Sequence, residues 1–274
     1  DRKSYRPNEP GVQPSVKAMD VNFSSMGRDF LRFNPDLVIT AATPPRQGRR
    51  SLGTNCDYTL GLIEAGIPVF VIENPNMPWV NGNQFAESRV VGVLHSTEEL
   101  VEPKAKPSIT PDEDDKIASF IAELIPCGAM LQMGIGYLPG PVLKKAARKI
   151  GAIWSEVLTD NMMSLPPGVP IVGTLAMGTR KFYDLINENP NVHLLPVEVT
   201  NSYSEIKQRN VISVNQAMKV TYGGATIVGA GKRFSGPGGA HDFGCAAEVS
   251  IIALRSTHSE QRVENGRKFT KLTS

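Results

Sequence analysis

Glycine-rich turns are the features of this sequence best suited to chemistry. The segment SGPGGAHDF at residues 235–243 carries Gly236, Gly238 and Gly239 beside His241. Glycines at this spacing let backbone N–H groups approach a ligand closely and allow positive φ angles. A tight loop between two elements explains the same composition, and composition alone favours that structural interpretation.

A second turn, MGIGYLP at residues 133–139, places Gly134 and Gly136 between a strand-like run and a predicted helix. Parallel α/β folds bind anions at such turns, because the following helix begins with unpaired N–H groups. The turn lacks the third glycine of the dinucleotide fingerprint, so it supports nicotinamide binding only weakly. Together the two turns predict a small-molecule site.

Other catalytic signatures are absent from the sequence. It contains no Gly-x-Ser-x-Gly elbow, no Walker lysine after a glycine run and no His-Glu-x-x-His helix. Cys56, Cys127 and Cys245 lie far apart, and the four histidines are equally scattered. We therefore expect no metal site and no disulfide framework. Reduced thiols and the lack of an apolar leader favour a cytoplasmic protein.

The composition of the chain gives no indication of a nucleic-acid or membrane partner. The chain has 274 residues, 29 Lys+Arg against 27 Asp+Glu, and a formal net charge of +2. At about 100–200 residues per domain, this length predicts two domains. Nearly balanced charge gives no overall field for nucleic acid or an acidic membrane surface. No apolar run approaches the ~18 residues that a membrane span needs.

The first third of the chain predicts a parallel βαβ unit. Residues 37–42 are typical of a buried strand, residues 56–65 have helical spacing with Gly66 as their stop, and residues 69–72 form a second strand. Short connections make these strands parallel. The Pro- and Asn-rich opening, through about Phe33, is expected to be irregular.

A composition shift at residues 102–115 predicts an interdomain linker, because this stretch has three prolines and almost no apolar residue. We expect a first domain at 1–102, a linker at 103–111 and a second domain at 112–274. A helix is predicted from Pro111 to Ile125, since carboxylates follow the proline at its start.

The strand and helix pattern then restarts, which predicts a second α/β domain. Gly223-Gly224 predicts a hairpin turn within it. Helices are predicted at 139–150 and 180–187, and strands at 130–133, 153–157, 171–176, 193–197, 212–215, 218–222, 225–229 and 249–254.

Read together, several stretches resemble the acetyl-CoA hydrolase/CoA-transferase family, especially its 4-hydroxybutyrate CoA-transferase type. They occur in the order and spacing of that family, from about Asp36 to the end of the chain. The matching stretches are PPRQGRRSLGTNCDYT (44–59), ENPNMPWVNG (73–82), LQMGIGYLPGPVL (131–143), MGTRKFYDLINENP (177–190), VISVNQAMKV (211–220) and SGPGGAHDF (235–243). The resemblance implies two open α/β domains, each partial relative to the family at one end, with mostly parallel sheets.

The resemblance also implies a function. Members move CoA between a short acyl-CoA and a small carboxylate, or hydrolyse acyl-CoA, so coenzyme A is a substrate and not a permanently bound cofactor. In the family a glutamate attacks the thioester, and a glutamyl-CoA thioester follows. A homo-oligomer or a complex with a related subunit is implied as well. The residues matching its substrate and CoA contacts are Gly134, Gly136, Val197, Glu198, Val199, Thr200, Asn201, Gly236, Gly238 and Gly239.

The family's glutamate position is occupied here by Lys219, four residues after Asn215, which matches the family's strand asparagine. A lysine ammonium, with an ordinary pKa of about 10.4, cannot attack a thioester until it is deprotonated. Its acyl product would be a stable amide. The glutamyl-thioester route is therefore expected to be closed at this position.

Three interpretations follow from Lys219. Another carboxylate could be the nucleophile, and Glu198, Glu205 and Glu248 are the nearest in sequence. Alternatively, the protein binds acyl-CoA for another reaction, with Lys219 in an electrostatic role and His241 as general base. In the third, the chain is a non-catalytic or partner-dependent subunit with a pseudo-active site.

Three basic residues between positions 46 and 50 allow a further expectation. Arg46, Arg49 and Arg50 could contact the phosphates of CoA. A solvated surface loop is the interpretation that the sequence favours for all three.

Overall fold

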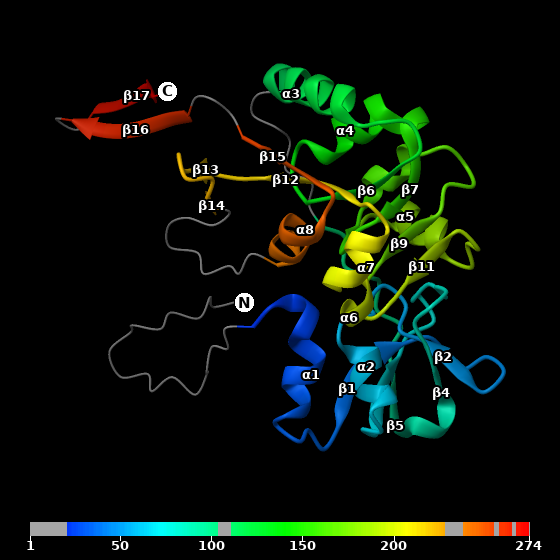
Figure 1. Ribbon diagram of the computed structural model, residues 1–274. Helices are drawn as coiled ribbons and strands as arrows, with labels where there is room; N and C mark the ends of the chain where they lie inside the picture. The colour runs from blue at the N-terminus through cyan, green and yellow to red at the C-terminus, as the bar shows by residue number, and fades with distance from the viewer. Residues whose placement is uncertain (1–20, 104–110, 228–237, 255–257, 265–266, 274) are drawn as a thin grey trace.

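Two parallel sheets organise the molecule (Figure 1), a computed structural model that describes residues 21–103, 111–227, 238–254, 258–264 and 267–273. The smaller sheet has the strand order β1-β3-β5, and the larger has the order β11-β9-β7-β6-β12-β15. Every pairing within these two sheets is parallel. The α/β class with mostly parallel sheets that the sequence predicts is confirmed.

The smaller sheet contains the predicted βαβ unit. Val38 pairs with Val69, and α2 between the two strands buries Leu60 and Ile63 before Gly66 ends it at a φ of +102°. The elements of this region are η1 (Phe23–Ser25), α1 (Met26–Leu31), β1 (Val38–Ala42), β2 (Arg49–Ser51), α2 (Thr59–Glu64), β3 (Val69–Glu73), β4 (Gln84–Ala86), η2 (Glu87–Arg89) and β5 (Val90–His95).

The short helix α1 corrects the expectation that the chain is irregular through Phe33. Six residues are too few to show helical periodicity, so packing against other elements stabilises α1 instead. The Phe30 and Tyr58 ring centroids lie 4.6 Å apart, which fixes α1 against the start of α2. The Ser25 hydroxyl also donates to Asp29 at 2.7 Å.

The larger sheet carries the second run of elements. Its first half comprises α3 (Pro111–Leu124), β6 (Ala129–Met133), α4 (Pro139–Ala146), η3 (Ala147–Lys149), β7 (Ile150–Trp154), β8 (Val157–Leu158), η4 (Asp160–Ser164), β9 (Ile171–Gly173), β10 (Leu175–Ala176) and α5 (Arg180–Ile186). Its second half comprises β11 (Val192–Leu194), α6 (Val197–Thr200), α7 (Tyr203–Gln208), β12 (Ile212–Gln216), β13 (Lys219–Val220), β14 (Thr226–Ile227), α8 (Ala240–Ala246), β15 (Val249–Ala253), β16 (His258–Glu264) and β17 (Arg267–Thr273).

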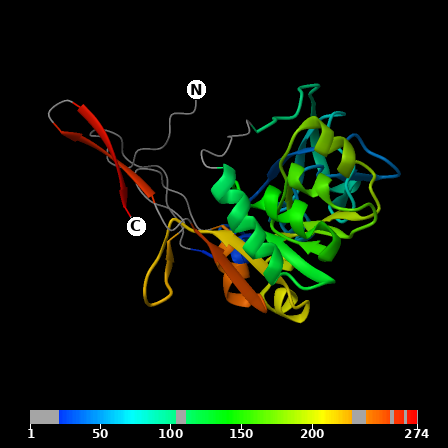
Figure 2. The same ribbon diagram turned by 90° about the horizontal axis from the view of Figure 1, so that it is seen from above.

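Helices cover both faces of the larger sheet, as parallel sheets require. Figure 1 shows α3 and α4 on one face and α7 and α8 on the other. Phe243 of α8 and Ile206 of α7 pack with Trp154 in a core on that second face. The β16–β17 hairpin projects away from the rest of the chain in both Figure 1 and Figure 2.

The strand predicted at residues 193–197 is wrong at its end. In the structure β11 ends at Leu194, and Val197 begins helix α6. Pro196 stands at the N-cap of α6, and its ring fixes a φ suited to entering a helix. The hairpin prediction at Gly223-Gly224 is confirmed, because β13 and β14 pair antiparallel on either side of it.

Backbone hydrogen bonds join the two sheet regions. The Leu194 N–H donates to Asn81 O at 2.8 Å, and the Glu188 N–H donates to Trp79 O at 2.7 Å. One continuous cluster of buried apolar side chains includes residues from both regions. The domain limits 1–102 and 112–274 and the linker at 103–111 stay predictions.

Candidate active site

A pocket of the described residues lies where the strand order of the larger sheet reverses. From β6 the chain adds β7, β9 and β11 on one side, and then returns to add β12 and β15 on the other. Ligands of open α/β sheets bind at such a reversal, outside the carboxyl ends of the strands. The pocket encloses about 550 Å³ and is lined by Gln132, Met133, Gly134, Ile135, Gly136, Tyr137, Glu156, Val157, Asn215, Gln216, Ala217, Met218, Gly238, Gly239 and Ala240.

The end of β6 forms one wall of this pocket. The Gly134 N–H donates to Val214 O at 2.9 Å, and the Tyr137 N–H donates to Gln216 Oε1 at 3.1 Å. Gly136 has a φ of +138°, and a Cβ on it would overlap the Gln216 side chain. Only glycine therefore allows this turn to close against the end of β12.

Two facing amides form the floor between β6 and β12. Asn215 Nδ2 donates to Gln132 Oε1 at 3.0 Å, and Gln132 Nε2 donates to Asn215 Oδ1 at 3.2 Å. Asn215 is only 5% exposed. This reciprocal pair holds both side chains in one orientation at the pocket, since each amide satisfies the other.

A carboxylate network forms the opposite wall. Asn201 Nδ2 donates to Glu156 Oε2 at 2.9 Å and lies 3.3 Å from Asp242 Oδ2. The Gly239 N–H also donates to the Glu156 carboxylate, and a Cβ at residue 239 would overlap that group. Asp242 accepts a further hydrogen bond from the Ser24 hydroxyl at 2.9 Å.

Burial is the largest influence on the Glu156 carboxyl and raises its pKa above the ordinary value. The hydrogen bond from Asn201 works in the opposite direction, and the nearby charge of Asp242 raises the pKa again. The net effect of these three influences is a raised pKa for Glu156. Glu156 is therefore a carboxylate with enhanced basicity at a pocket wall.

Lys219 and His241 lie beside this pocket without lining it. Lys219 begins β13, is exposed and pairs with Ile227 across the hairpin, directly after the lining residue Met218. His241 is exposed on α8, with its Nε2 at 3.9 Å from the Cys245 sulfur. The catalytic roles expected of both residues stay predictions.

The expected CoA contacts separate into two groups. Gly134, Gly136, Gly238 and Gly239 line the pocket, whereas Gly236 lies outside the described residues. In the other group, Asn201 joins the network of Glu156 through its side chain, and the remaining residues, Val197, Glu198, Val199 and Thr200, form α6 and do not line the pocket. Their role in CoA binding stays a prediction.

The three alternative carboxylates do not line the pocket. The Glu198 carboxylate lies against Gly27 of α1, and burial raises its pKa. Glu205 pairs with Arg209 on α7, and Glu248 is exposed. Sequence reasoning missed Glu156 because it predicted a strand over residues 153–157. In the structure β7 ends at Trp154, so Glu156 stands at the carboxyl edge of the sheet.

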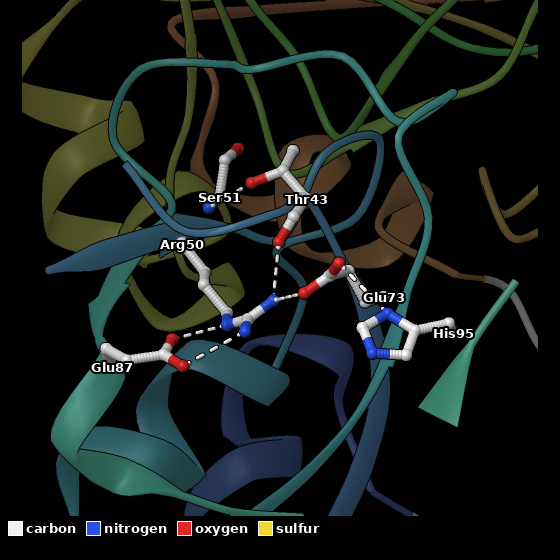
Figure 3. Close-up of polar contacts among 6 residues, drawn as sticks. All are labelled: Thr43, Arg50, Ser51, Glu73, Glu87 and His95. Atoms are coloured by element: carbon white, nitrogen blue, oxygen red, sulfur yellow. Dashed lines mark hydrogen bonds and ion pairs between the residues drawn. The ribbon is translucent and has the colours of Figure 1, made fainter. Parts of the chain in front are cut away.

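Arg50 corrects the favoured interpretation that all three basic residues lie in a solvated surface loop. Figure 3 shows its guanidinium between Glu87 and Glu73, with further hydrogen bonding to the Thr43 carbonyl. Arg50 Nη1 lies 2.7 Å from Glu73 Oε2, and Arg50 Nη2 lies 3.0 Å from Glu87 Oε1. Arg50 is only 2% exposed, so it is held inside the smaller sheet region.

The other two arginines are also engaged within the protein. Arg46 pairs with Glu188 and lies over the Trp79 ring, and Arg49 donates to Gln84 O at 2.8 Å. These contacts tie the β2 region to the larger sheet and to β4. Arg46 and Arg49 remain largely exposed at the surface.

The described part of the chain offers neither a metal-binding cluster nor a membrane-spanning helix. No group of three or more His, Cys, Asp or Glu side chains is placed there to hold a metal ion. No described helix combines the length and apolar character required to cross a membrane.

A family model matches the last third of the chain. Residues 178–271 match the acetyl-CoA hydrolase/transferase C-terminal domain. This segment includes Asn215 and the Gly238–Gly239 turn, which line the pocket, and Asn201, which donates to Glu156.

Similar proteins of known activity are CoA-transferases. The chain is 34% identical to the 4-hydroxybutyrate coenzyme A transferase of Clostridium kluyveri over 254 residues, covering 82% of this chain and 57% of that protein. It is 28% identical to the butyryl-CoA:acetate CoA-transferase of Anaerostipes caccae over 265 residues, covering 85% of this chain and 58% of that protein. The chain thus spans little more than half the length of these relatives.

Solved structures show the same fold. The 4-hydroxybutyrate CoA-transferase of Porphyromonas gingivalis matches with a TM-score of 0.73 at 25% identity, covering 86% of this chain and 63% of that one. RipA of Yersinia pestis matches with a TM-score of 0.75 at 27% identity, covering 87% of this chain and 58% of that one.

Proposed function

Since the chain belongs to the acetyl-CoA hydrolase and CoA-transferase family, we propose that it binds a short acyl-CoA and cleaves its thioester bond. The pocket at the reversal of the strand order is the observation that carries this proposal. Coenzyme A is then a substrate of the chain and not a resident cofactor. The comparisons support a small carboxylate as the second substrate of a transfer reaction.

The thioester end of the substrate fits this pocket by size and by chemistry. A volume of about 550 Å³ accommodates a short acyl group and its thioester carbonyl. The backbone at Gly238–Gly239 and the Asn215 amide supply polar groups, and Met133 and Ile135 supply apolar surface. Hydrogen bonds to a developing oxyanion are worth about 3 kcal/mol per donor in such sites.

Lys219 takes an electrostatic role in this proposal. It lies at the hairpin next to Met218, so an ammonium there can pair with a carboxylate acceptor or with a phosphate of CoA at the pocket edge. It does not attack the thioester, for the chemical reasons given above. A second candidate function, a partner-dependent subunit, is favoured by this same residue, because a lysine stands where the family has its glutamate.

To test this proposal, the full chain is incubated with a panel of short acyl-CoA thioesters and with acetate as acceptor. Mass spectrometry then follows every CoA species in the mixture. Wild type should consume at least one thioester. Lys219→Glu restores a carboxylate at the position expected for the family's nucleophile, and it should gain transfer of CoA to acetate. Lys219→Gln is the matched control, because it removes the charge without adding a nucleophile.

Two outcomes would contradict the proposal. If wild type binds no acyl-CoA, the pocket has another ligand. If wild type binds acyl-CoA but consumes it only when a related protein is added, the partner-dependent subunit is the correct function. A homo-oligomer or related-subunit complex, which the family resemblance implies, is tested by the mass of the particle in the same preparations.

A further inference from the structure

Glu156 is the only carboxylate among the described residues that line the pocket. It comes from the segment after β7 and lies directly against Gly239, and the end of β12 lines the same pocket. The family resemblance assigns no role to this residue. Its position places an acid-base group where a thioester carbonyl would lie.

Neighbouring groups hold the Glu156 carboxylate in one orientation. The Asn201 amide donates to Oε2 at 2.9 Å, and the Gly239 backbone N–H donates to the same carboxylate. The Thr200 hydroxyl donates to Asn201 Oδ1 at 2.9 Å, which fixes the direction in which the Asn201 amide points. A catalytic group must be oriented in this way, because a displaced base loses rate steeply.

The charge around Glu156 suits a proton acceptor. Asp242 of α8 is the charged group that faces it, from the other side of the Asn201 amide, and no described lysine, arginine or histidine lines the pocket. Burial and Asp242 raise the pKa of Glu156, and the two hydrogen bonds keep its ionised form accessible. A base of this kind is most effective when its pKa approaches the working pH.

We propose that Glu156 is the general base of an acyl-CoA hydrolysis in this pocket. The inference rests on the proposed function, because it takes the pocket to hold the thioester. It specifies water, and not a carboxylate, as the acceptor in the wild-type chain.

The reaction balances with groups already named. Glu156 removes a proton from a water molecule as the water oxygen bonds to the thioester carbon, and the carbonyl electrons move onto oxygen. When the tetrahedral intermediate collapses, the carbon–sulfur bond breaks and the sulfur takes the proton back from Glu156. The products are the carboxylic acid and the CoA thiol, and Glu156 is again ionised.

A base, and not a nucleophile, is the role consistent with the hydrogen bonds. Acylation of Glu156 would place a bulky acyl group on a carboxylate whose oxygens already accept hydrogen bonds from Asn201 and Gly239. Accepting and returning a proton adds no heavy atom to the carboxyl group, so both donors can keep their positions. The network around Glu156 therefore remains in place through the cycle.

The experiment compares wild type, Glu156→Gln and Glu205→Gln in the full chain. Release of CoA thiol from a panel of short acyl-CoA thioesters gives kcat, and binding of a non-hydrolysable CoA thioether gives Kd. Glu156→Gln should lower kcat about 10²- to 10⁴-fold with Kd unchanged within about threefold. Glu205→Gln is the control, since it makes the same charge change on α7, outside the pocket.

Two further measurements separate a base from a merely structural residue. The kcat of wild type should fall in acid with a pKa above about 4.3, the ordinary value of glutamate, and this limb should be absent from the residual rate of Glu156→Gln. In ¹⁸O-labelled water, the label should enter the released acid, and the peptide that contains Glu156 should remain unlabelled and free of acyl or CoA adducts.

Each contrary result has its own meaning. Normal hydrolysis by Glu156→Gln overturns the inference, and an adduct or label on Glu156 identifies a nucleophile instead. Binding of the thioether without hydrolysis of any thioester overturns the inference and leaves acyl-CoA binding intact. Absence of binding overturns the proposed function and the inference together.

Discussion

Glutamates belong to two hydrogen-bond networks of this molecule, and the charges around these glutamates differ between the two networks. In the smaller sheet region, Glu73 and Glu87 share the buried guanidinium of Arg50. In the pocket of the larger sheet, Glu156 shares the amide of Asn201 with Asp242, and the network of described residues contains no cation. The first network is closed on itself, whereas the second opens onto the pocket.

The carboxyl pKa values move in opposite directions for this reason. The hydrogen bond from Arg50 holds the pKa of Glu73 below its ordinary value, although burial works against it. Burial raises the pKa of Glu156, and its neutral amide partner compensates only in part. A paired cation makes a carboxylate structural, while a neutral donor leaves it able to accept a proton.

The variant with the largest expected effect on stability removes the cation of the first network, the guanidinium of Arg50. Arg50→Met leaves Glu73 and the partly exposed Glu87 facing each other without their counter-charge. Breaking a fully buried ion pair costs about 3–5 kcal/mol, and the exposure of Glu87 reduces this cost. We therefore expect a loss of about 2–3 kcal/mol in the free energy of unfolding, measured by urea denaturation.

The control for Arg50→Met is the triple variant with Glu73→Gln and Glu87→Gln. It removes the uncompensated charges together with the guanidinium, and it should recover most of the lost stability. An Arg50→Met protein as stable as wild type would show that this network is solvated, and the contrast with Glu156 would disappear.

The alternation of strands and helices could be predicted from the sequence, but the order of strands could not. Apolar runs such as Leu37–Ala42 and turn signals such as Gly223-Gly224 are local, and both predictions hold. The return of β12 to the side of β6 joins Val214 with Met133, which lie far apart in sequence. Such pairing depends on packing of the whole sheet, and it creates the reversal at which the pocket forms.

The candidate site could be predicted in part, for a similar reason. The glycine-rich composition and the family resemblance already indicate Gly134, Gly136 and Asn215 as site residues. The structure brings the three residues to one pocket. Glu156 gives no such signal, because a single glutamate after an apolar strand is common in any α/β protein. Its environment comes from Asn201 and Asp242, which only the folded chain brings to it.

The pH dependence of stability gives a smaller and more specific test. Glu156 has a folded pKa above its unfolded value, so its contribution to stability is present below the unfolded pKa and is lost as pH rises through the folded one. Glu156→Gln should therefore gain stability relative to wild type as the pH rises from about 4 to about 7.

Glu73→Gln should show the opposite sign in the same measurement. The folded pKa of Glu73 is lowered, so its contribution is present above the unfolded pKa and is lost as pH falls through the folded one. Glu73→Gln should be less stable than wild type near neutral pH, and the difference should shrink in acid. Parallel pH profiles for the two variants would contradict the contrast between the networks.

The smallest expected effect on stability concerns the histidine at the edge of the first network. His95 Nδ1 lies 3.1 Å from Glu73 Oε1, but the His95 side chain is 78% exposed (Figure 3). Exposed ion pairs contribute about 0–1 kcal/mol, because water and salt screen them. His95→Gln should therefore change the free energy of unfolding by less than about 1 kcal/mol at any pH. If it instead matched Arg50→Met, His95 would be a main partner of Glu73, and a buried guanidinium would no longer explain why Glu73 and Glu156 differ.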